Sequence, residues 1–532
     1  MNRSSAIKSL MAKAVRALNQ GAYKELIRYC EQILSLDPKQ SDAWFFASIA
    51  AAASRNVAKA LEFVDKALAL QPNNAEYLAQ KAKLHSLVNQ YEQALAAAGK
   101  ISVSGTKNAL VLDTIGVVYS KLGRFVQARD ALSKAVALQS GNPQFHFNLA
   151  SVEQFLGNID AAAEHFEKAI SLKPDFARAH WSLSELGKTK SEAIHTDRLE
   201  KLLQKSGSTV QDKLYLCHAL SREYEKQGDY ARAFEALVKG KKNMRSQLKY
   251  SFERDEKLFS KSKEAFPAER ASPSPATADE NASGERMIFV MGMPRSGTTL
   301  LDRMLASHSQ VSSLGEIQDF ALAVRKNVQL NDNTVLSPNI IEQAATSSLA
   351  DIGERYLSSV AAHKADTQFV IDKTPLNFLY VGFIMNALPK AKIVCLRRNA
   401  MDTVLSNYRQ LFAIDYSYYG YHYDLLDTAR YYALFEQLMT HWREMFGNRL
   451  YEVSYERLVT EPEPVLTSTL AHLGLEWQAE CLEFHNSKEA VSTASSVQVR
   501  EKLYSSASGR WKKYSEQLKP VQDLFDTMGI EY

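Results

Sequence analysis

The sequence predicts an α + α/β architecture, with an N-terminal helical solenoid followed by a domain built on a parallel sheet. Three observations predict it. Small and apolar residues recur with a fixed period in the first half, residues 267–286 are rich in Pro, Ala, Ser and charge, and short apolar runs then alternate with helical stretches. We therefore expect a repeat domain at 1–266, a linker at 267–286 and a second domain at 287–532.

The repeat is marked by turn residues at a spacing of 34. Pro38, Pro72 and Pro174 follow this period, with Thr106 and Ser140 at the places between them. Small residues that let two helices approach closely stand at the same period: Ala60, Ala94, Ala128 and Ala162, with Ala67, Ala135 and Ala169 on the second helix of each pair. Leucines are expected to close each pair against the next: Leu36, Leu70, Leu138 and Leu172.

This pattern resembles the tetratricopeptide repeat, with five units over residues 7–176. A sixth unit places Gly228, Tyr230 and Ala233 at the expected positions. Stacked units form a superhelix with a concave surface. That surface either binds a protein or peptide, as acceptor or partner, or serves as a structural extension of the next domain.

The net charge and the cysteine spacing limit the classes of function that we expect. A net charge of +4 over 532 residues argues against a general nucleic-acid binder but allows a local basic pocket. The four cysteines are far apart and match no metal-ligand spacing, so we expect reduced thiols and no metal site. They are Cys30, Cys217, Cys395 and Cys481.

The length and pattern of the apolar segments indicate where in the cell the protein is expected. The first 20 residues suggest an amphipathic helix, not a signal peptide, and the longest apolar stretch, at 44–53, is too short to span a membrane. We expect a cytoplasmic protein without a membrane span. The oligomeric state stays open.

Beyond the linker, apolar runs at 287–293, 369–372 and 392–396 end in turn or basic residues, and a helical stretch covers 427–446. Strands that alternate with helices predict a parallel sheet with helices on both faces. Ligands of such sheets bind at the carboxyl ends of the strands.

The segment GMPRSGTTLL, residues 292–301, predicts a P-loop-like anion cradle between a strand and a helix. The backbone N–H groups of Ser296, Gly297, Thr298 and Thr299 are expected to face phosphate oxygens. A kinase that uses this loop is an alternative. Against it, Thr298 stands where nucleotide-triphosphate loops carry lysine, and the charge lies at Arg295.

A second motif, RRNAMDTVLSNYR, places Arg398 and Ser406 eight residues apart. If a helix begins between them, both can contact one phosphate. Arg397 and Arg398 also occupy the strand end where a magnesium-binding Asp would be needed.

The pair PRSGTTL and RN(x)6S resembles the sulfotransferases, which use 3′-phosphoadenosine-5′-phosphosulfate (PAPS) as donor and need no metal. With the GE pair at Glu316, the likeness is strongest to the tyrosylprotein sulfotransferases and covers residues 287–515. The resemblance implies a 5′-phosphosulfate site at the loop and a 3′-phosphate site at Arg398 and Ser406.

The resemblance also implies roles for single residues. Arg295 and Lys373 would stabilise the transferring group, and Glu316 would be the base. Tyr455 would lie near the nucleotide. Ser495 and Arg510 would close over the donor phosphates, with arginine where the family has lysine.

Other interpretations of these residues stay open. Glu316 could cap a helix, Lys373 could be a surface turn lysine, and Tyr455 could be a core aromatic. The aromatic segment 413–424 could line an acceptor entrance or be a packed loop. We expect a sulfotransferase acting on a hydroxyl, with protein tyrosine among the acceptors. The alternative is a protein-interaction scaffold with an inactive nucleotide-binding domain.

Overall fold

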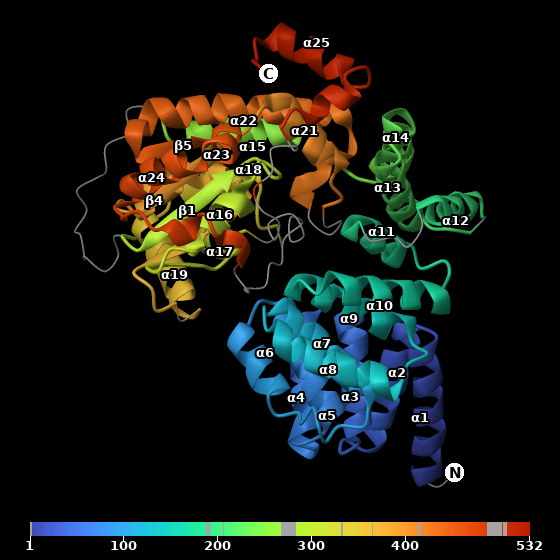
Figure 1. Cartoon of the computed structure of the whole chain (residues 1–532). Coiled ribbons are helices and arrows are strands. Elements are labelled where there is room, and N and C mark those ends of the chain that lie inside the picture. Colours follow the sequence, from blue (N-terminus) through green and yellow to red (C-terminus); the bar gives the residue numbers. More distant parts are fainter. Residues whose placement is uncertain are drawn as a thin grey trace. The chain divides into compact units, whose positions relative to one another are not determined.

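A computed structural model describes residues 3–187, 192–205, 207–267, 284–330, 334–363, 365–412, 417–486, 503 and 508–532. The chain forms two compact units, Met1–Ala179 and His180–Tyr532. Figure 1 shows the all-helical first unit in blue and cyan, and the unit that carries the sheet in green to red.

The first unit is a stack of five helical hairpins, which confirms the five predicted repeats. The predicted alanines are fully buried between helices, because only a methyl group fits where the helix backbones approach. The helices are α1 Arg3–Asn19, α2 Tyr23–Leu36, α3 Ser41–Ala53, α4 Val57–Leu70, α5 Ala75–Leu87, α6 Tyr91–Ala98, α7 Ala109–Lys121, α8 Phe125–Leu138, α9 Pro143–Leu156 and α10 Ile159–Leu172.

Three of the four leucines expected to close each pair are exposed, and only Leu36 is half-buried. Leu70, Leu138 and Leu172 are the last residues of α4, α8 and α10, and they are 40%, 45% and 36% exposed. Contact with the next repeat passes instead through residues one turn earlier, such as the buried Ala67 and Ala135.

The second unit contains a five-stranded parallel sheet with the order β2-β3-β1-β4-β5, as predicted for this half. The strands are β1 Met287–Gly292, β2 Val311–Ser313, β3 Phe369–Asp372, β4 Lys392–Arg397 and β5 Leu450–Ser454. The helices after β1 are α16 Thr298–Ala306, α17 Asp319–Lys326, α18 Pro338–Ala345, α19 Leu349–Ala361, α20 Val381–Ala387, α21 Ala400–Arg409, α22 Leu425–Phe446, α23 Tyr455–Thr460, α24 Pro462–Leu473 and α25 Lys519–Met528.

Two cores cover the two faces of this sheet. Along β1, Phe289 and Met291 enter one core, while Ile288 and Val290 enter the other. This alternation follows from the two-residue period of a strand. The larger core contains α22, which lies beside the helix α15, Phe252–Glu264 (Figure 1).

The helices just before the predicted linker belong to the second unit, apart from the first three residues of α11. They are α11 Ala177–Leu186, α12 Glu192–Gln204, α13 Val210–Lys226, α14 Tyr230–Arg245 and α15 Phe252–Glu264. The sixth predicted repeat is the hairpin of α13 and α14.

The compact units divide at residue 179, not at the predicted 267–286 segment, because these helices pack on the sheet domain. Phe259 and Phe266 are buried in its larger core. A Cβ atom on Gly382 would lie 2.3 Å from the Phe266 ring, so the two segments are in close contact. Of the predicted linker, residues 268–283 lie outside the described residues.

Candidate active site

Each of the five strands is followed by a candidate residue at its carboxyl end. The 293–297 loop follows β1, Lys373 follows β3, Arg398 follows β4 and Tyr455 follows β5, while Glu316 comes three residues after β2. All the strands are parallel, so these ends lie at one edge of the sheet. The sheet topology therefore gathers residues that are far apart in the sequence.

The loop between β1 and α16 requires its two glycines. Gly292 and Gly297 have φ angles of 150° and 105°, and a Cβ atom at either position would lie 2.5 Å from a neighbour. The neighbours are the Leu396 carbonyl oxygen and the Tyr455 ring. The loop thus passes close over β4 and the start of α23.

Ser296 has a different contact from the one predicted. Its N–H donates to the Met293 carbonyl oxygen at 3.1 Å, so this group is already used within the loop. Its hydroxyl is buried and has no hydrogen-bond partner among the described residues. A buried hydroxyl without a partner is suited to an anion oxygen. Thr298 and Thr299 form the buried first turn of α16, where helix N–H groups favour negative charge.

Arg295 takes an uncommon backbone conformation for a side chain, with φ at 65°. Burial lowers the pKa of its guanidinium to about 10, and Arg222 and Arg398 add to this effect. The group still carries its charge at neutral pH. A positive charge disfavoured by burial and by like charges gains from an anion placed beside it.

The two arginines at the end of β4 have different surroundings. The Arg397 guanidinium pairs with Glu436 and Glu452, so its charge is neutralised within the fold. The Arg398 Nη1 atom donates to the Arg295 carbonyl oxygen at 3.0 Å, and its guanidinium lies 4.6 Å from the centre of the Tyr455 ring. Arg398 therefore lies against the loop. That it shares a phosphate with Ser406 stays a prediction.

Helix α21 begins directly after Arg398 and carries Ser406 in its second turn, partly exposed. The same helix also contacts the loop through Asn407, a residue that the sequence motif did not indicate. Asn407 Nδ2 donates to the Pro294 carbonyl oxygen at 2.6 Å, while the Tyr421 hydroxyl donates to Asn407 Oδ1 at 3.0 Å. Both Asn407 and Ser406 thus belong to one structural element of the site.

Glu316 and Lys373 form an ion pair, with Lys373 Nζ 2.5 Å from Glu316 Oε1. The Lys373 side chain is fully buried, whereas that of Glu316 is 44% exposed. Lys373 is therefore not a surface lysine, and Glu316 is paired with this lysine and is not a helix-capping acid. The backbone holds them together, because the Lys373 N–H donates to the Gly315 carbonyl oxygen at 3.0 Å.

The residue before Lys373 is also buried and polar. Asp372 accepts hydrogen bonds from Thr374 at 2.7 Å and from Tyr356 at 3.0 Å. Burial raises the pKa of its carboxyl group to about 7. Thr374 donates as well to the Ile317 carbonyl oxygen at 2.6 Å, although its single hydroxyl hydrogen serves one acceptor at a time. Asp372 and Thr374 thereby connect β3 to the segment that carries Glu316.

Tyr455 combines two of the interpretations given for it. It is 7% exposed and belongs to the smaller core of the sheet, so it is a core aromatic. It also forms the surface on which Gly297 and Arg398 rest. The ring thus lies directly under the 293–297 loop.

Arg510 is held beside α21 by a residue that sequence reasoning missed. Asp402 accepts hydrogen bonds from the N–H groups of Gly509 at 2.6 Å and Trp511 at 2.9 Å. Arg510 lies between these two residues, on the turn that Asp402 fixes. Ser495 lies outside the described residues.

A further group of charges comes from the helices before the sheet. Arg222 on α13 donates to Glu185 at 2.6 Å, and Glu225 on the same helix pairs with Arg409 at the end of α21. No local sequence pattern marks these residues, because Glu225 and Arg409 are separated by 184 positions.

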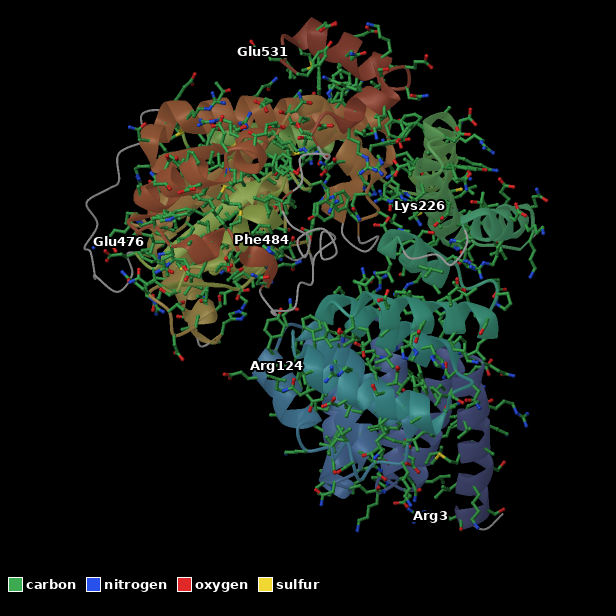
Figure 2. The ribbon with its side chains drawn as sticks, in the orientation of Figure 1. Arg3, Arg124, Lys226, Glu476, Phe484 and Glu531 are labelled. Atoms are coloured by element: carbon green, nitrogen blue, oxygen red, sulfur yellow. The ribbon has the colours of Figure 1, made fainter. Side chains whose placement is uncertain are left out.

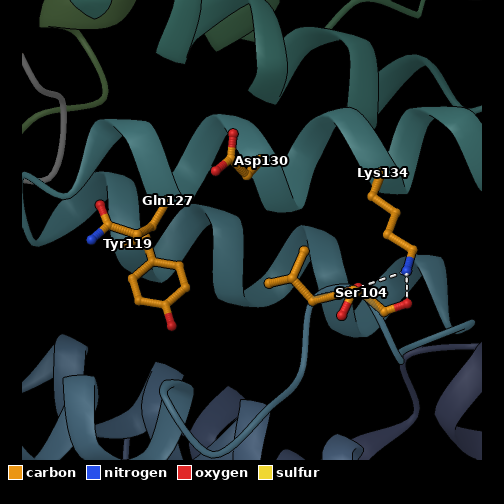
Figure 3. Close-up of a pocket in the computed structure, with 6 residues that line it drawn as sticks. Ser104, Tyr119, Gln127, Asp130 and Lys134 are labelled. Carbon is orange, nitrogen blue, oxygen red and sulfur yellow. Dashed lines mark hydrogen bonds between the residues drawn. The ribbon is translucent and has the colours of Figure 1, made fainter.

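The repeat unit has a groove of its own, with a volume of about 620 Å³. Figure 3 shows Tyr119, Gln127 and Asp130 along it, and Lys134 reaching down to the Ser104 segment. Lys134 Nζ donates to the carbonyl oxygens of Val103 at 2.7 Å and Ser104 at 2.5 Å. The Lys134 ammonium group that lines the groove is therefore already hydrogen-bonded to two backbone carbonyl groups.

The second unit is an α/β domain with a candidate anion site at the carboxyl edge of its sheet, and the first unit consists of helical repeats. Residues 287–479 match the family described as the sulfotransferase family. Residues 17–84 and 143–176 match tetratricopeptide repeat families. The chain therefore carries a sulfotransferase family domain together with tetratricopeptide repeats, as the two sequence patterns predict.

Several relatives share part of this arrangement. An uncharacterized protein of Aquifex aeolicus (strain VF5) is 29% identical over 75% of this chain and 53% of its own length. The protein-tyrosine sulfotransferase of Drosophila melanogaster is 26% identical over 42% of this chain and 46% of its own length. The chain spans about half the length of these curated relatives.

Among solved structures, a thermophilic TPR protein of Thermus thermophilus is 20% identical and covers 34% of this chain and 98% of its own length, with a TM-score of 0.31. Within the described part of the chain, none of the helices has the length and apolar character needed to cross a membrane.

Proposed function

We propose that this sulfotransferase uses PAPS as donor and transfers its sulfuryl group to the hydroxyl of a protein tyrosine. The observation that carries the proposal is the arrangement at the carboxyl edge of the sheet. The 293–297 loop, called the anion loop below, carries Arg295 and a buried Ser296 hydroxyl that has no partner among the described residues. Arg398 lies against this loop, and an acid–lysine pair follows the neighbouring strands.

The donor supplies an activated sulfuryl group and leaves as adenosine 3′,5′-bisphosphate. In this proposal the 293–299 loop binds the 5′ end of the donor through the Ser296 hydroxyl, the N–H groups of Gly297, Thr298 and Thr299, and the Arg295 guanidinium. Arg398, Ser406 and Arg510 bind the 3′-phosphate, and Tyr455 supports the nucleotide. Ser495 is proposed on the family resemblance alone.

Glu316 is the proposed base. A tyrosine hydroxyl has an ordinary pKa of about 10, so a carboxylate beside it is needed for attack near neutral pH. Glu316 takes the phenolic proton while the acceptor oxygen forms its bond to sulfur and the bond between sulfur and the bridging phosphate oxygen breaks. Lys373 and Arg295 stabilise the negative charge that moves to the bridging oxygen.

The aromatic segment near Glu316 supports a phenolic acceptor. Gln318, two residues after Glu316, donates to the Tyr418 hydroxyl at 3.3 Å. Tyr419 stacks on Phe412 with ring centres 4.4 Å apart. These rings offer a flat apolar surface close to the proposed base. Residues 413–416 of the segment lie outside the described residues.

The repeats are proposed to bind a protein, either the acceptor or a separate partner, because stacked repeats offer an extended binding surface and this unit has a groove. The cytoplasm is the proposed location. It is supported by four buried cysteines that are all free thiols.

Transfer of ³⁵S from labelled PAPS to a tyrosine peptide tests the proposal. The matched control is the same peptide with serine in place of tyrosine, which separates the donor claim from the acceptor claim. Label on the tyrosine peptide alone supports both claims. Label on the serine peptide alone refutes the tyrosine acceptor. Calorimetry with adenosine 3′,5′-bisphosphate and a chelator tests the donor site directly, and a site that bound only ATP with magnesium would refute PAPS as donor.

A further inference from the structure

Glu225 on α13 is a buried carboxylate surrounded by three arginines from three parts of the second unit. It accepts hydrogen bonds from the Tyr514 hydroxyl and the Arg409 guanidinium. Arg222 Nη1 and Arg510 Nη2 each lie 3.5 Å from Glu225 Oε2. The Glu225 side chain is 5% exposed.

The charges of this cluster do not cancel. Burial alone would raise the pKa of Glu225, but Arg409, Arg222 and Arg510 lower it to about 2, so the carboxylate is charged. Glu185 supplies a second carboxylate, paired with Arg222 at 2.6 Å. Three guanidinium groups and two carboxylates leave one positive charge.

The charges of this cluster act at the 293–297 loop. Burial and Arg222 lower the pKa of Arg295, Glu185 raises it, and Arg398 and Arg409 lower it further. Positive charge that is partly buried and exceeds the negative charge around it favours an anionic ligand. The cluster therefore forms one flank of the proposed donor site.

The turn that carries Arg510 is held at both ends by acidic residues. Asp402 binds the N–H groups of Gly509 and Trp511 at its start, on α21. Glu225 binds the Tyr514 hydroxyl at its end, on α13. Arg510 itself is 36% exposed, so its guanidinium has access to solvent and to a ligand.

We propose that Glu225 is a positioning residue of the donor site, which holds the Arg510 guanidinium beside α21 for the 3′-phosphate of the nucleotide. The inference rests on the proposed function. It assigns to α13, in the hairpin that resembles a sixth repeat, a part in nucleotide recognition. Without the carboxylate, Arg409 and Arg222 would repel Arg510, and its side chain would turn toward solvent.

A role in packing alone makes a different prediction. If Glu225 only fixed α13 to α21, its loss would lower stability and would weaken all nucleotides alike. A positioning role concerns the 3′-phosphate. The test therefore compares adenosine 3′,5′-bisphosphate with adenosine 5′-phosphate, which differ in that group only.

The experiment is calorimetry on the full chain with these two nucleotides. Glu225→Gln should weaken the bisphosphate roughly tenfold and the monophosphate much less, since one charge-assisted contact is misplaced. Arg510→Ala should have the same selective effect. The double variant should bind no more weakly than Arg510→Ala alone, because both changes remove one interaction.

Glu223→Gln is the matched control. Glu223 is an equally buried glutamate on the same helix, but its partners are His195 at 3.2 Å and Lys226 at 3.0 Å. Lys226 extends from the end of α13 (Figure 2). This control should leave the ratio of the two affinities unchanged. If Glu225→Gln does not fold, Glu225→Asp carries the test, because it keeps the charge of the cluster but shortens the side chain, and the contact with Arg510 is already long at 3.5 Å.

The outcomes separate this inference from the proposed function. A wild-type chain that fails to bind the bisphosphate overturns both. A wild-type chain that binds it, together with a Glu225 variant that weakens both nucleotides equally or adds to Arg510→Ala, overturns the positioning role and leaves the proposed function standing.

Discussion

Replacing Glu316 with glutamine should separate binding from chemistry in this domain. Glutamine keeps the shape of the side chain and its carbonyl oxygen, which can still accept a hydrogen bond from Lys373. It cannot take the acceptor proton. A positioned base contributes about 10²–10⁴-fold to a rate, so kcat should fall by about that factor.

The ion pair adds a second expectation. Lys373 Nζ lies 2.5 Å from Glu316 and is fully buried, so its charge is largely committed to that carboxylate. Glutamine would release this charge to the sulfuryl group. A hydrogen bond to a charged group contributes about 1.5–3 kcal/mol, and glutamine keeps part of the contact with Lys373, so we expect the lower end of that range, about tenfold tighter binding of PAPS to the variant. Adenosine 3′,5′-bisphosphate lacks the sulfuryl group and should bind as before.

Single-turnover transfer of ³⁵S and calorimetry with both nucleotides measure these effects. Glu461→Gln is a suitable control, because this glutamate is 57% exposed and its pair with Arg457 lies on the surface of α23 and α24. Near-normal transfer by Glu316→Gln would show that another group takes the proton. Weaker binding of PAPS would show that the pair does not hold Lys373 back from the donor.

Arg398→Ala should weaken adenosine 3′,5′-bisphosphate by about 2–3 kcal/mol and Ser406→Ala by roughly 1 kcal/mol, as calorimetry can measure, because the guanidinium makes charge-assisted contacts and the hydroxyl a neutral one. A fragment of residues 180–532 should bind this nucleotide, whereas residues 284–532 should not form a soluble domain, because α15 supplies Phe259 and the segment after it supplies Phe266 to the main core. Burial raises the pKa of Asp372 to about 7, so its contribution to stability is present below its unfolded value of 3.8 and is lost as the pH rises through 7. The melting temperature of Asp372→Asn should therefore fall less than that of the wild type between about pH 4 and pH 8.

Three results would contradict these expectations. Unchanged nucleotide affinity in Arg398→Ala would remove the 3′-phosphate site from the end of β4. A folded 284–532 fragment would show that α13–α15 are not needed by the sheet domain. A melting temperature of Asp372→Asn that follows the wild type across this pH range would mean that Asp372 keeps an ordinary pKa.

Much of the fold follows from short-range pattern. Each hairpin contains the residues that define the repeat period. Candidate residues follow each strand within a few positions of its carboxyl end. Parallel strands bring their carboxyl ends to one edge, so the pattern alone places the loop with Arg295 and the Arg398 motif there, whereas Lys373 and Tyr455 are indicated by the family resemblance.

Other parts depend on contacts that no local pattern records. Glu225 meets Arg409 across 184 residues, and its environment exists only after α13 packs on the sheet domain. The sequence places the boundary at the polar segment 267–286, because composition shows where a chain is hydrophilic but not which core a helix joins. Asp402 and Asn407 lie inside a recognised motif, yet their roles depend on the Gly509 turn and the Pro294 carbonyl group that lie opposite them.

The different partners of Arg397 and Arg398 determine how the site would respond to a shift in the register of β4. Successive residues of a strand face opposite sides, so a one-residue slip of β4 would turn each side chain to the other face. A slip that brought Arg398 to the place of Arg397, beside Glu436 and Glu452, would bring Asn399 to the place of Arg398. Each side chain would move by about 3.3 Å along the strand, and the 293–297 loop would lose the arginine that lies against it. The two glutamates thus help to set the alignment of the sheet, since they favour the register that turns Arg397 toward them and Arg398 toward the loop.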